Sequence, residues 1–349
     1  MKAITVTPRS AGTVRLEDVA EPDARGGSIL VETVAVGVCG TDIEIIEGQY
    51  GWAPPGRERL IIGHESLGRV IDPGTDPGLN HGDLIAGIVR RPDPIPCPSC
   101  AVGEWDMCSN GQYTEYGIKQ LDGFMAQRWR IVPGQTMKIE PSLGMLGVLL
   151  EPTTIVVKAW EHVHSVGARA YWEPHTALIT GAGPIGLLAA LLGVQHGLEV
   201  HVLDRASSGP KPDAVRALGA TYHTGSPVDI GFAPDVIIEC TGVGALIGNC
   251  LNVLGPGGIL CLTGVGNGGH VPTSSTADIA SKIVLGGNIL VGTINANKRH
   301  WYKATRALMR ADPDWLERLI TRRVPPEHFE SALRRTPEDI KVVIQFAPL

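Results

Sequence analysis

The sequence predicts an α/β protein with two domains, a β-rich one followed by a doubly wound parallel sheet. Over residues 1–150, short β-branched runs alternate with Gly, Pro and Asp turns, which is typical of compact β structure. Beyond about residue 155, strand-like runs alternate with helical ones, and this order implies crossover connections between parallel strands. A glycine-rich loop at 181–186 lies between a strand and a helix, where such sheets bind nucleotides.

Length and composition fit an ordinary globular protein, since 349 residues suffice for about two domains of roughly 150 residues each. Charged residues make up 19% and the formal net charge is −6 without a basic block, which argues against a nucleic-acid or anionic-membrane partner. The 7 cysteines, an odd number, indicate reduced thiols or metal ligands rather than disulfides. The start, MKAITVTPRS, lacks a signal peptide's apolar stretch, and no apolar run approaches the roughly 18 residues of a membrane span. We therefore expect a cytoplasmic protein.

Short strands make up the first predicted domain. They are ITVTP (4–8), SILVETVAVGV (28–38), LGRVI (67–71) and DLIAGIV (83–89). The pattern changes at EPTTIVVKAWEHVHSV (151–166), where apolar residues recur at helical spacing and Pro152 suits a first helical turn. The tail returns to amphipathic helix over 300–320 and ends in a strand, IKVVIQF (340–346).

Strands and helices alternate in the second predicted domain. The strands are TALIT (176–180), EVHVLDR (199–205), PDVIIECTG (234–242), GGILCLTGVG (257–266) and GNILVGTI (287–294). Helical patterns at 184–197 and 212–220 supply crossovers between them. The last strand is apolar and is expected at the edge of the sheet, which favours self-association because an uncovered edge pairs readily with another chain.

The glycine loop predicts a dinucleotide site in a Rossmann domain. Gly181 allows the tight turn, Gly183 lets the backbone approach a pyrophosphate, and Gly186 permits close helix packing. The helix N-terminus adds unpaired N–H groups and a partial positive charge. Asp204 follows Gly186 by 18 residues, where a carboxylate binds the adenosine ribose. The same glycine pattern also occurs in tight turns without a ligand, and it is the combination with Asp204 that favours a dinucleotide.

Asp204 also bears on the choice between NAD and NADP. A carboxylate at this position accepts hydrogen bonds from the ribose hydroxyls of NAD and repels the additional phosphate of NADP. Arg205, the next residue, softens that repulsion. We therefore expect NAD to be preferred, with NADP possible.

Two short motifs in the first domain carry residues that suit a metal. GVCGTDIEIIEG contains Cys39, and IIGHESLGRV contains His64 and Glu65. Thiolate and imidazole are ligands that zinc prefers, and a catalytic zinc site keeps one position open. Taken singly, Cys39 reads as a small buried residue and His64 as a turn histidine. Their similar settings, after β-rich runs and beside glycines, favour a shared metal site.

The motifs G-x-C-G-T-D (37–42), G-H-E-x-x-G (63–68) and G-x-G-P-x-G (181–186) stand in an order and spacing that resembles the medium-chain zinc-dependent alcohol dehydrogenase superfamily. The resemblance covers essentially the whole chain. Three further strings, CGTDIEIIEGQYG, YTEYGIKQLDGFM and VGTINANKRHW, resemble its glucose dehydrogenase branch.

This resemblance implies a GroES-like catalytic domain at 1–155, with a structural lobe near 90–115. It implies a Rossmann NAD(P)-binding domain at 156–299 and a C-terminal segment, 300–349, that returns to the catalytic domain. In the family the edge strand pairs with its twofold mate, so we expect a homodimer or homotetramer.

The resemblance also assigns roles to the metal motifs. The implied ligands of the catalytic zinc are Cys39, His64, Glu65, either directly or through water, and Glu151. Asp42 is implied as the acceptor that orients the His64 ring, and Thr41 as the hydroxyl that relays the substrate proton. Glu151 begins a helix, so its carboxylate could instead serve only the helix dipole.

Cofactor and substrate contacts follow in the same way. The implied dinucleotide contacts are Gly181, Gly183, Pro184, Ile185, Gly186, Asp204, Arg205, Thr241, Gly264 and Asn295. Substrate contacts are expected from Thr41, Glu115, Glu151 and Asn295. Glu115 could also be a surface charge and Asn295 a turn residue. Val89 stands where some family members have an asparagine that contacts glucose, so an aldose is a safer expectation than glucose itself.

The lobe contains Cys97, Cys100 and Cys108, which match the last three cysteines of the family's structural zinc motif. The position of the first is Pro94, which cannot bind a metal. The neighbouring Asp93 can, because carboxylate oxygens also bind zinc. We expect a second, structural zinc with Asp93 as its fourth ligand, the alternative being an empty lobe.

The sequence therefore predicts a zinc-dependent dehydrogenase that transfers hydride from a sugar hydroxyl, of an aldose such as glucose, to NAD(P) and yields the lactone. The alternatives are a zinc-dependent dehydrogenase of another polyol, cyclitol or secondary alcohol and, more remotely, a non-catalytic nucleotide-binding protein on the same fold.

Overall fold

The computed structural model describes residues 1–24, 27–266 and 276–349 and divides the chain into two compact units. The first unit comprises Met1–Glu151, Ala296–Met309 and Ile320–Leu349, and the second comprises Pro152–Asn295 and Arg310–Leu319. The division after Glu151 comes slightly earlier than the boundary predicted at 155. The C-terminal return begins at Ala296, before the predicted residue 300, and a short stretch of it belongs to the second unit.

The first unit is built from three β-sheets. The largest has the order β11-β6-β5-β3-β19-β18, with β10 also paired to β3, and the two smaller sheets have the orders β2-β1-β4 and β7-β8-β9. The strands are β1 (Lys2–Val6), β2 (Arg15–Asp18), β3 (Ile29–Gly37), β4 (Leu60–Ile61), β5 (Glu65–Asp72), β6 (Leu84–Gly87), β7 (Arg90–Arg91), β8 (Thr114–Tyr116), β9 (Gln120–Leu121), β10 (Arg128–Ile131), β11 (Thr136–Lys138), β18 (Ile320–Val324) and β19 (Lys341–Gln345).

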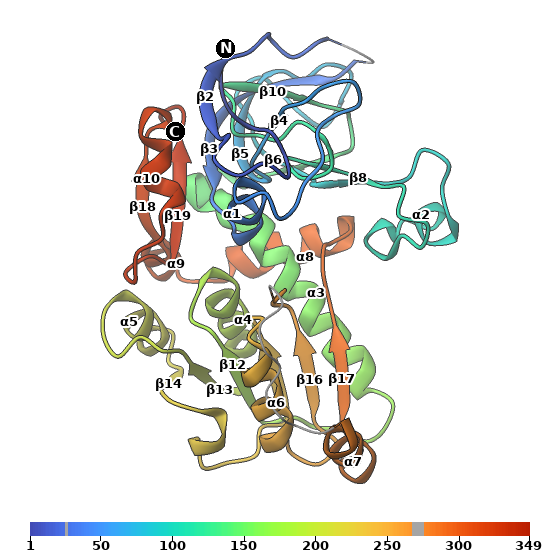
Figure 1. Ribbon diagram of the computed structural model, residues 1–349, viewed down its shortest axis with the longest axis vertical. Helices are drawn as coiled ribbons and strands as arrows, with labels where there is room; N and C mark the ends of the chain where they lie inside the picture. Colours follow the sequence, from blue (N-terminus) through green and yellow to red (C-terminus); the bar gives the residue numbers. More distant parts are fainter. Residues whose placement is uncertain (25–26, 267–275) are drawn as a thin grey trace. The chain divides into compact units, whose positions relative to one another are not determined.

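The C-terminal strand completes the largest sheet. β19 pairs antiparallel with β3 on one side and parallel with β18 on the other. Figure 1 shows β18 and β19 in red beside α10. The helices of this unit are α1 (Gly40–Ile46), α2 (Pro98–Ala101), η1 (Trp105–Met107), η2 (Pro141–Leu149), α8 (Lys298–Met309), η4 (Pro326–His328) and α10 (Phe329–Leu333). α2 and η1 form the predicted lobe, which extends away from the sheets of this unit in Figure 1.

The second unit is a six-stranded parallel sheet of order β14-β13-β12-β15-β16-β17. Its strands are β12 (Thr176–Thr180), β13 (Glu199–Leu203), β14 (Thr221–His223), β15 (Val236–Glu239), β16 (Ile259–Leu262) and β17 (Ile289–Gly292). Its helices are α3 (Leu150–Gly167, which starts in the first unit), α4 (Pro184–Gln195), α5 (Pro210–Ala217), η3 (Pro227–Asp229), α6 (Gly244–Val253), α7 (Thr276–Gly286) and α9 (Pro313–Leu319). The strand order reverses between β12 and β15, which is where such sheets bind ligands.

One apolar segment, Pro141–Gly167, is long enough to cross a membrane, which no run in the sequence had indicated. It comprises η2 and α3, and 83% of its most apolar window is buried inside the protein. This degree of burial is typical of a core helix.

Candidate metal and nucleotide sites

Three ligand-type side chains converge in the first unit. Cys39, His64 and Glu65 place a sulfur, a ring nitrogen and a carboxylate oxygen within 4.8 Å of one another. Cys39 is the N-cap of α1, and His64 immediately precedes Glu65, the first residue of β5. Because β5 pairs with β3, which ends at Gly37, the sheet brings both sequence motifs together. Gly37 must be a glycine, since a Cβ there would lie 2.0 Å from the Glu65 carboxylate.

Asp42 connects two members of this cluster. Its Oδ2 accepts a hydrogen bond from the Cys39 backbone N–H at 2.8 Å, and its Oδ1 lies 3.5 Å from His64 Nδ1. Burial opposes a charge on His64, but the nearby Asp42 and Cys39 outweigh it and raise the pKa of His64 well above its usual range. The surroundings of the His64 ring therefore favour a positive charge there, and a metal ion bound to the imidazole would supply it.

Glu65 forms an ion pair that the sequence did not reveal. Lys341 Nζ donates to both carboxylate oxygens of Glu65, at 2.7 and 2.5 Å, and to the Val38 carbonyl at 3.2 Å. Both charged side chains are 2% exposed. The sequence signal that could have revealed this ion pair is the lone Lys341 within the apolar strand IKVVIQF. A charged side chain in a buried strand is tolerated only when the charge has a partner.

Glu151, the second residue of α3, is buried beside the same group of charges. Burial raises the pKa of Glu151 to about 7; His64 lowers it and Glu65 raises it. Its carboxylate lies outside the 4.8 Å group among the described residues, although these charges place it nearby. Thr41, two residues after Cys39, lies in the first turn of α1 and is half-buried.

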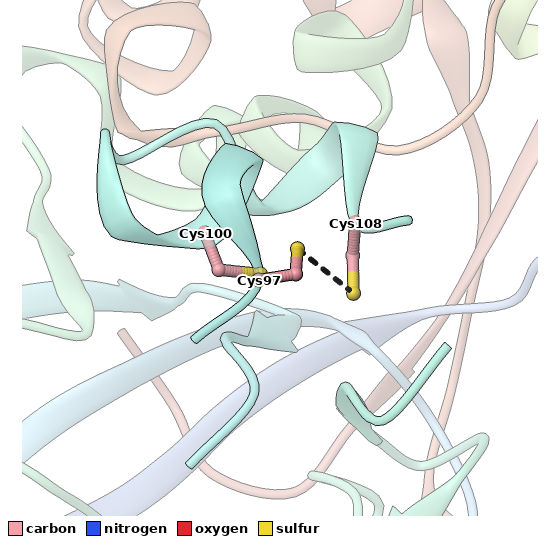
Figure 2. Close-up of side chains that lie close together, drawn as sticks. All are labelled: Cys97, Cys100 and Cys108. Atoms are coloured by element: carbon pink, nitrogen blue, oxygen red, sulfur yellow. Dashed lines mark hydrogen bonds between the residues drawn. The ribbon is translucent and has the colours of Figure 1, made fainter. Parts of the chain in front are cut away.

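In the lobe, the three predicted cysteines converge. The sulfurs of Cys97, Cys100 and Cys108 lie within 4.8 Å of one another, and those of Cys97 and Cys108 are 4.0 Å apart (Figure 2). Zinc–sulfur bonds of about 2.3 Å in a tetrahedron need sulfurs about 3.8 Å apart, so the three thiols fit a zinc ion. Backbone N–H groups of Cys100 and Ser109 lower the pKa of the Cys97 thiol to about 6, whereas burial raises that of Cys100 to about 11.

Asp93 does not join the three sulfurs as the predicted fourth ligand among the described residues. Its carboxylate accepts hydrogen bonds from the Ile95 backbone N–H at 2.9 Å and from the Asn110 side-chain amide. The amide oxygen of Asn110 in turn accepts from the Cys108 thiol at 3.1 Å. The Asp93 carboxylate is therefore connected to the sulfurs through Asn110, a residue that the cysteine spacing did not single out, while the Asp93 backbone N–H lies beside the Cys100 thiol.

Glu115, predicted as a substrate contact, is buried on β8 opposite Arg90 of β7. Arg90 Nε and one terminal nitrogen lie 3.0 and 2.9 Å from Glu115 Oε1. The same guanidinium stacks over the Tyr113 ring at 3.6 Å from its centroid. Glu115 is therefore not a surface charge but a fixed carboxylate, and Arg90 is a positioning residue that sequence reasoning missed.

The glycine loop of the second unit has the geometry its sequence predicts. Gly181 has a φ of 90°, which strongly favours glycine, and Gly183 is the N-cap of α4, which starts with Pro184 and Ile185. A Cβ at Gly183 would have no neighbour within 4 Å in the described part of the chain, so a ligand has room to approach. A Cβ at Gly186 would lie 1.7 Å from the Gly181 carbonyl oxygen, so only glycine fits there.

Asp204 follows β13, which ends at Leu203, two residues before the end of the predicted strand. Its carboxylate accepts hydrogen bonds from the backbone N–H groups of Ala182, at 2.7 Å, and Ala206, at 3.0 Å. Asp204 is thereby tied to the glycine loop, while the neighbouring Arg205 is exposed.

The remaining predicted cofactor residues lie in the loops that follow β15, β16 and β17. Thr241 comes two residues after the end of β15, and Gly264 two after the end of β16. These loops pack closely, since a Cβ at Gly264 would lie 2.2 Å from the backbone nitrogen of Gly242. Asn295 has a left-handed φ of 60° at the last residue before the chain leaves the second unit.

Comparison with known proteins identifies the family. The family model for the glucose dehydrogenase C-terminus matches residues 144–346, and that for the alcohol dehydrogenase GroES-like domain matches residues 25–141. Glucose 1-dehydrogenase 1 of Caldivirga maquilingensis is 37% identical over 100% of both chains, and glucose 1-dehydrogenase of Thermoproteus tenax is 38% identical over 99% of both. The structure of Haloferax mediterranei glucose dehydrogenase in complex with NADP, Zn and gluconolactone matches with a TM-score of 0.92 and 31% identity, covering 100% of each chain.

These matches confirm the predicted fold class, a GroES-like domain with a Rossmann-type parallel sheet. They span the whole chain, at identities that establish common descent and not only a shared fold. The chain belongs to the zinc-dependent medium-chain dehydrogenase superfamily, in its glucose dehydrogenase branch.

Proposed function

We propose that this protein is a zinc-dependent dehydrogenase that oxidises an aldose, glucose or a close relative, to its lactone with NAD(P). The observation that carries the proposal is the convergence of the half-buried Cys39 thiol with the buried His64 imidazole and Glu65 carboxylate. The similar Haloferax mediterranei enzyme, whose structure holds NADP, Zn and gluconolactone, supports the same reaction and substrate class here.

Charge balance suggests how the zinc is held. Cys39 as thiolate and Glu151 as carboxylate would offset the two positive charges of the ion, with His64 as a neutral third ligand. Glu65 and Lys341 neutralise each other, so Glu65 would stand beside the ion or meet it through water. When bound, zinc supplies a Lewis acid that lowers the pKa of the substrate hydroxyl.

The side chains around the metal site are proposed to orient its ligand, to transfer the substrate proton and to hold the dinucleotide. Asp42 Oδ1, 3.5 Å from His64 Nδ1, would orient the His64 ring. The Thr41 hydroxyl accepts the substrate proton and passes it toward solvent. The glycine loop at 181–186 holds the dinucleotide whose nicotinamide accepts the hydride.

Glu115 and Asn295 are proposed to select a polyhydroxylated substrate. Arg90 holds the Glu115 carboxylate in one place, so its hydrogen-bonding direction is set before a sugar arrives. A simple alcohol would leave such fixed polar groups unpaired, which is the usual origin of strong discrimination. A polyol, a cyclitol or another secondary alcohol remains the alternative substrate class.

NAD is proposed as the preferred dinucleotide, with NADP also used. Asp204 is held by two backbone N–H groups and presents its charge where the additional phosphate of NADP would lie. Exposed Arg205 offsets part of this repulsion. Asp204→Ala should therefore shift the preference toward NADP, as measured by kcat/KM for both dinucleotides.

Three further parts of the proposal concern the whole protein. A second, structural zinc binds the lobe thiols, with Asp93 or water completing the site. The chain assembles as a homodimer or homotetramer and works in the cytoplasm.

The deciding experiment is a substrate panel. Purified protein with zinc is offered aldoses, other polyols, cyclitols and simple secondary alcohols, each with NAD and NADP, and formation of reduced nicotinamide is followed by absorbance. Highest kcat/KM on an aldose, lost on zinc removal and recovered on its return, is the expected result. A preference for another alcohol would correct the substrate class, and dinucleotide binding without turnover would indicate a non-catalytic protein.

A further inference from the structure

Glu239, the last residue of β15, is a carboxylate with an exposed fraction of 0% inside the second unit. Burying a charge is costly unless hydrogen bonds or an opposite charge compensate it. Within the described residues no lysine, arginine or histidine pairs with Glu239. Its compensation comes from hydrogen-bond donors, and those donors show what the carboxylate does.

The carboxylate joins the ends of two neighbouring strands. Oε1 accepts from the Thr180 hydroxyl, at the end of β12, at 3.2 Å. It also accepts from the Thr241 backbone N–H at 2.7 Å and from the Thr241 hydroxyl. Oε2 accepts from the Gly242 backbone N–H at 3.0 Å. Successive N–H groups that converge in this way form an anion-binding nest, and here the protein's own carboxylate fills it.

The backbone of Glu239 adds a third strand to this connection. Its carbonyl oxygen accepts from the Thr263 backbone N–H at 2.8 Å, the Thr263 hydroxyl at 2.9 Å and the Gly264 backbone N–H at 3.1 Å. These residues follow the end of β16. One residue therefore fixes the carboxyl ends of β12, β15 and β16 relative to one another.

This location lies at the reversal of strand order in the parallel sheet, where dinucleotides bind beyond the carboxyl ends of the strands. Of the proposed cofactor contacts, Thr241 is held by the Glu239 carboxylate and Gly264 by the Glu239 backbone carbonyl. Because the Thr241 and Gly242 N–H groups are occupied by the carboxylate, the pyrophosphate must use N–H groups elsewhere, as at the start of α4.

We propose that the Glu239 carboxylate is a positioning group of the dinucleotide site, holding the turn after β15 against the end of β12 in the shape the cofactor requires before it binds. The proposal rests on the dinucleotide binding given above as part of the proposed function. A preformed site binds more tightly because ordering is not required at the moment of association.

The test variant is Glu239→Gln, which keeps the shape but places an amide NH₂ against backbone donors. Asp235→Asn is a matched control, because Asp235 lies at the opposite end of β15. Its Oδ2 accepts from the His175 and Thr176 backbone N–H groups, both at 2.9 Å, and from the Thr176 hydroxyl at 3.0 Å. Both substitutions disturb the link between β12 and β15, but only Glu239→Gln does so at the carboxyl ends.

The measurement is a fluorescence titration of each holoenzyme with reduced dinucleotide in the absence of sugar, with thermal unfolding and zinc content measured in parallel. We expect Glu239→Gln to raise the Kd about tenfold and Asp235→Asn less than about twofold, with zinc content unchanged in both. If Glu239→Gln does not fold, Thr180→Val removes a single donor and should raise the Kd about two- to threefold.

Equal Kd changes in the two carboxylate variants, scaling only with their loss of thermal stability, would overturn the proposal and leave a purely structural role. An unchanged Kd in a folded Glu239→Gln or Thr180→Val protein would overturn it as well. Failure of the wild-type protein to bind any dinucleotide would instead refute the proposed function, and this inference with it.

Discussion

Two ionisable side chains at the candidate metal site, His64 and Glu65, each have an oppositely charged group as a close neighbour. Asp42 faces His64, and Lys341 contacts both oxygens of Glu65. Sequence motifs identified the ligand-type residues because those stand beside characteristic glycines. They could not identify Lys341, which lies 276 residues from Glu65 in the chain and meets it only through the pairing of β19 with β3.

Cys39→Ala should abolish turnover without unfolding the protein. Loss of the thiolate removes a proposed zinc ligand and with it several kcal/mol of transition-state stabilisation, so kcat should fall by about a thousandfold or more. Steady-state kinetics, zinc analysis and dinucleotide titration are the measurements. Cys250→Ala, a buried thiol of the second unit's core, is the control and should keep both zinc and turnover. Full activity in Cys39→Ala would contradict the zinc mechanism.

Lys341→Met should destabilise the protein and change its zinc affinity. The substitution leaves the buried Glu65 carboxylate without its cation, which typically costs roughly 3–5 kcal/mol of unfolding free energy. Zinc should then recruit Glu65 as a ligand and bind more tightly, closing the open position and lowering kcat.

Chemical unfolding and competition with a chelator would measure the two effects of Lys341→Met. The double variant Glu65→Gln/Lys341→Met removes both charges and should regain most of the lost stability. A Lys341→Met protein as stable as the wild type would show that the ion pair has no structural role.

Secondary-structure elements could be predicted where the local sequence pattern favours the same conformation that the tertiary packing requires. In the strand–glycine–helix unit around Gly183, the spacing of the glycines alone predicts the tight turn, the helix end that faces the phosphates and the close packing contact. β14 (Thr221–His223) was missed because a three-residue strand carries no periodic signal. In η2 (Pro141–Leu149) the apolar pattern hides a break at Gly144, whose φ of 47° and ψ of −125° are not helical.

Cys100→Ser should release the proposed structural zinc from the lobe and leave the zinc at Cys39 and His64 in place. Because metal binding at a structural site is also folding free energy, the thermal unfolding temperature should fall. Turnover should suffer far less than in Cys39→Ala. Elemental analysis together with thermal unfolding checks both statements.

Asp93→Ala provides the comparison within the same lobe. The Asp93 carboxylate contacts Asn110 and not the sulfurs, and its backbone N–H beside the Cys100 thiol survives the substitution, so Asp93→Ala should lower stability less than Cys100→Ser. Zinc content that is the same in Cys100→Ser and the wild type would mean that the three thiols hold no metal.

At the scale of the whole molecule, neither unit is one continuous stretch of sequence, because the chain passes from one unit to the other several times. The first of these passages could be predicted, because the sequence pattern changes from strand-like to helical near residue 150. The return crossings were placed less well, because Ala296–Met309 and Arg310–Leu319 form neighbouring helices that belong to different units. Amphipathic patterns show that a helix has a buried face but do not show which core receives it.

The edge of the parallel sheet leads to a prediction of self-association. β17 (Ile289–Gly292) is the last strand of the sheet, and Leu290 on it is 40% exposed. Nearby in the chain, Val284 and Leu285 of α7 are 76% and 87% exposed. An apolar edge strand with unpaired backbone groups pairs readily with another strand. We therefore expect a dimer in which β17 meets its twofold equivalent and the sheet continues across both chains.

Leu290→Lys should shift the protein toward the monomer, because a charge on an apolar edge strand opposes pairing. Light scattering over a range of concentrations gives the mass of each form. Val228→Lys is the control, since Val228 is 55% exposed and lies in η3, which follows β14 at the opposite edge of the sheet. It should leave the mass of the assembly unchanged. A wild-type protein that stays monomeric at all concentrations would show that something other than a second chain protects this edge.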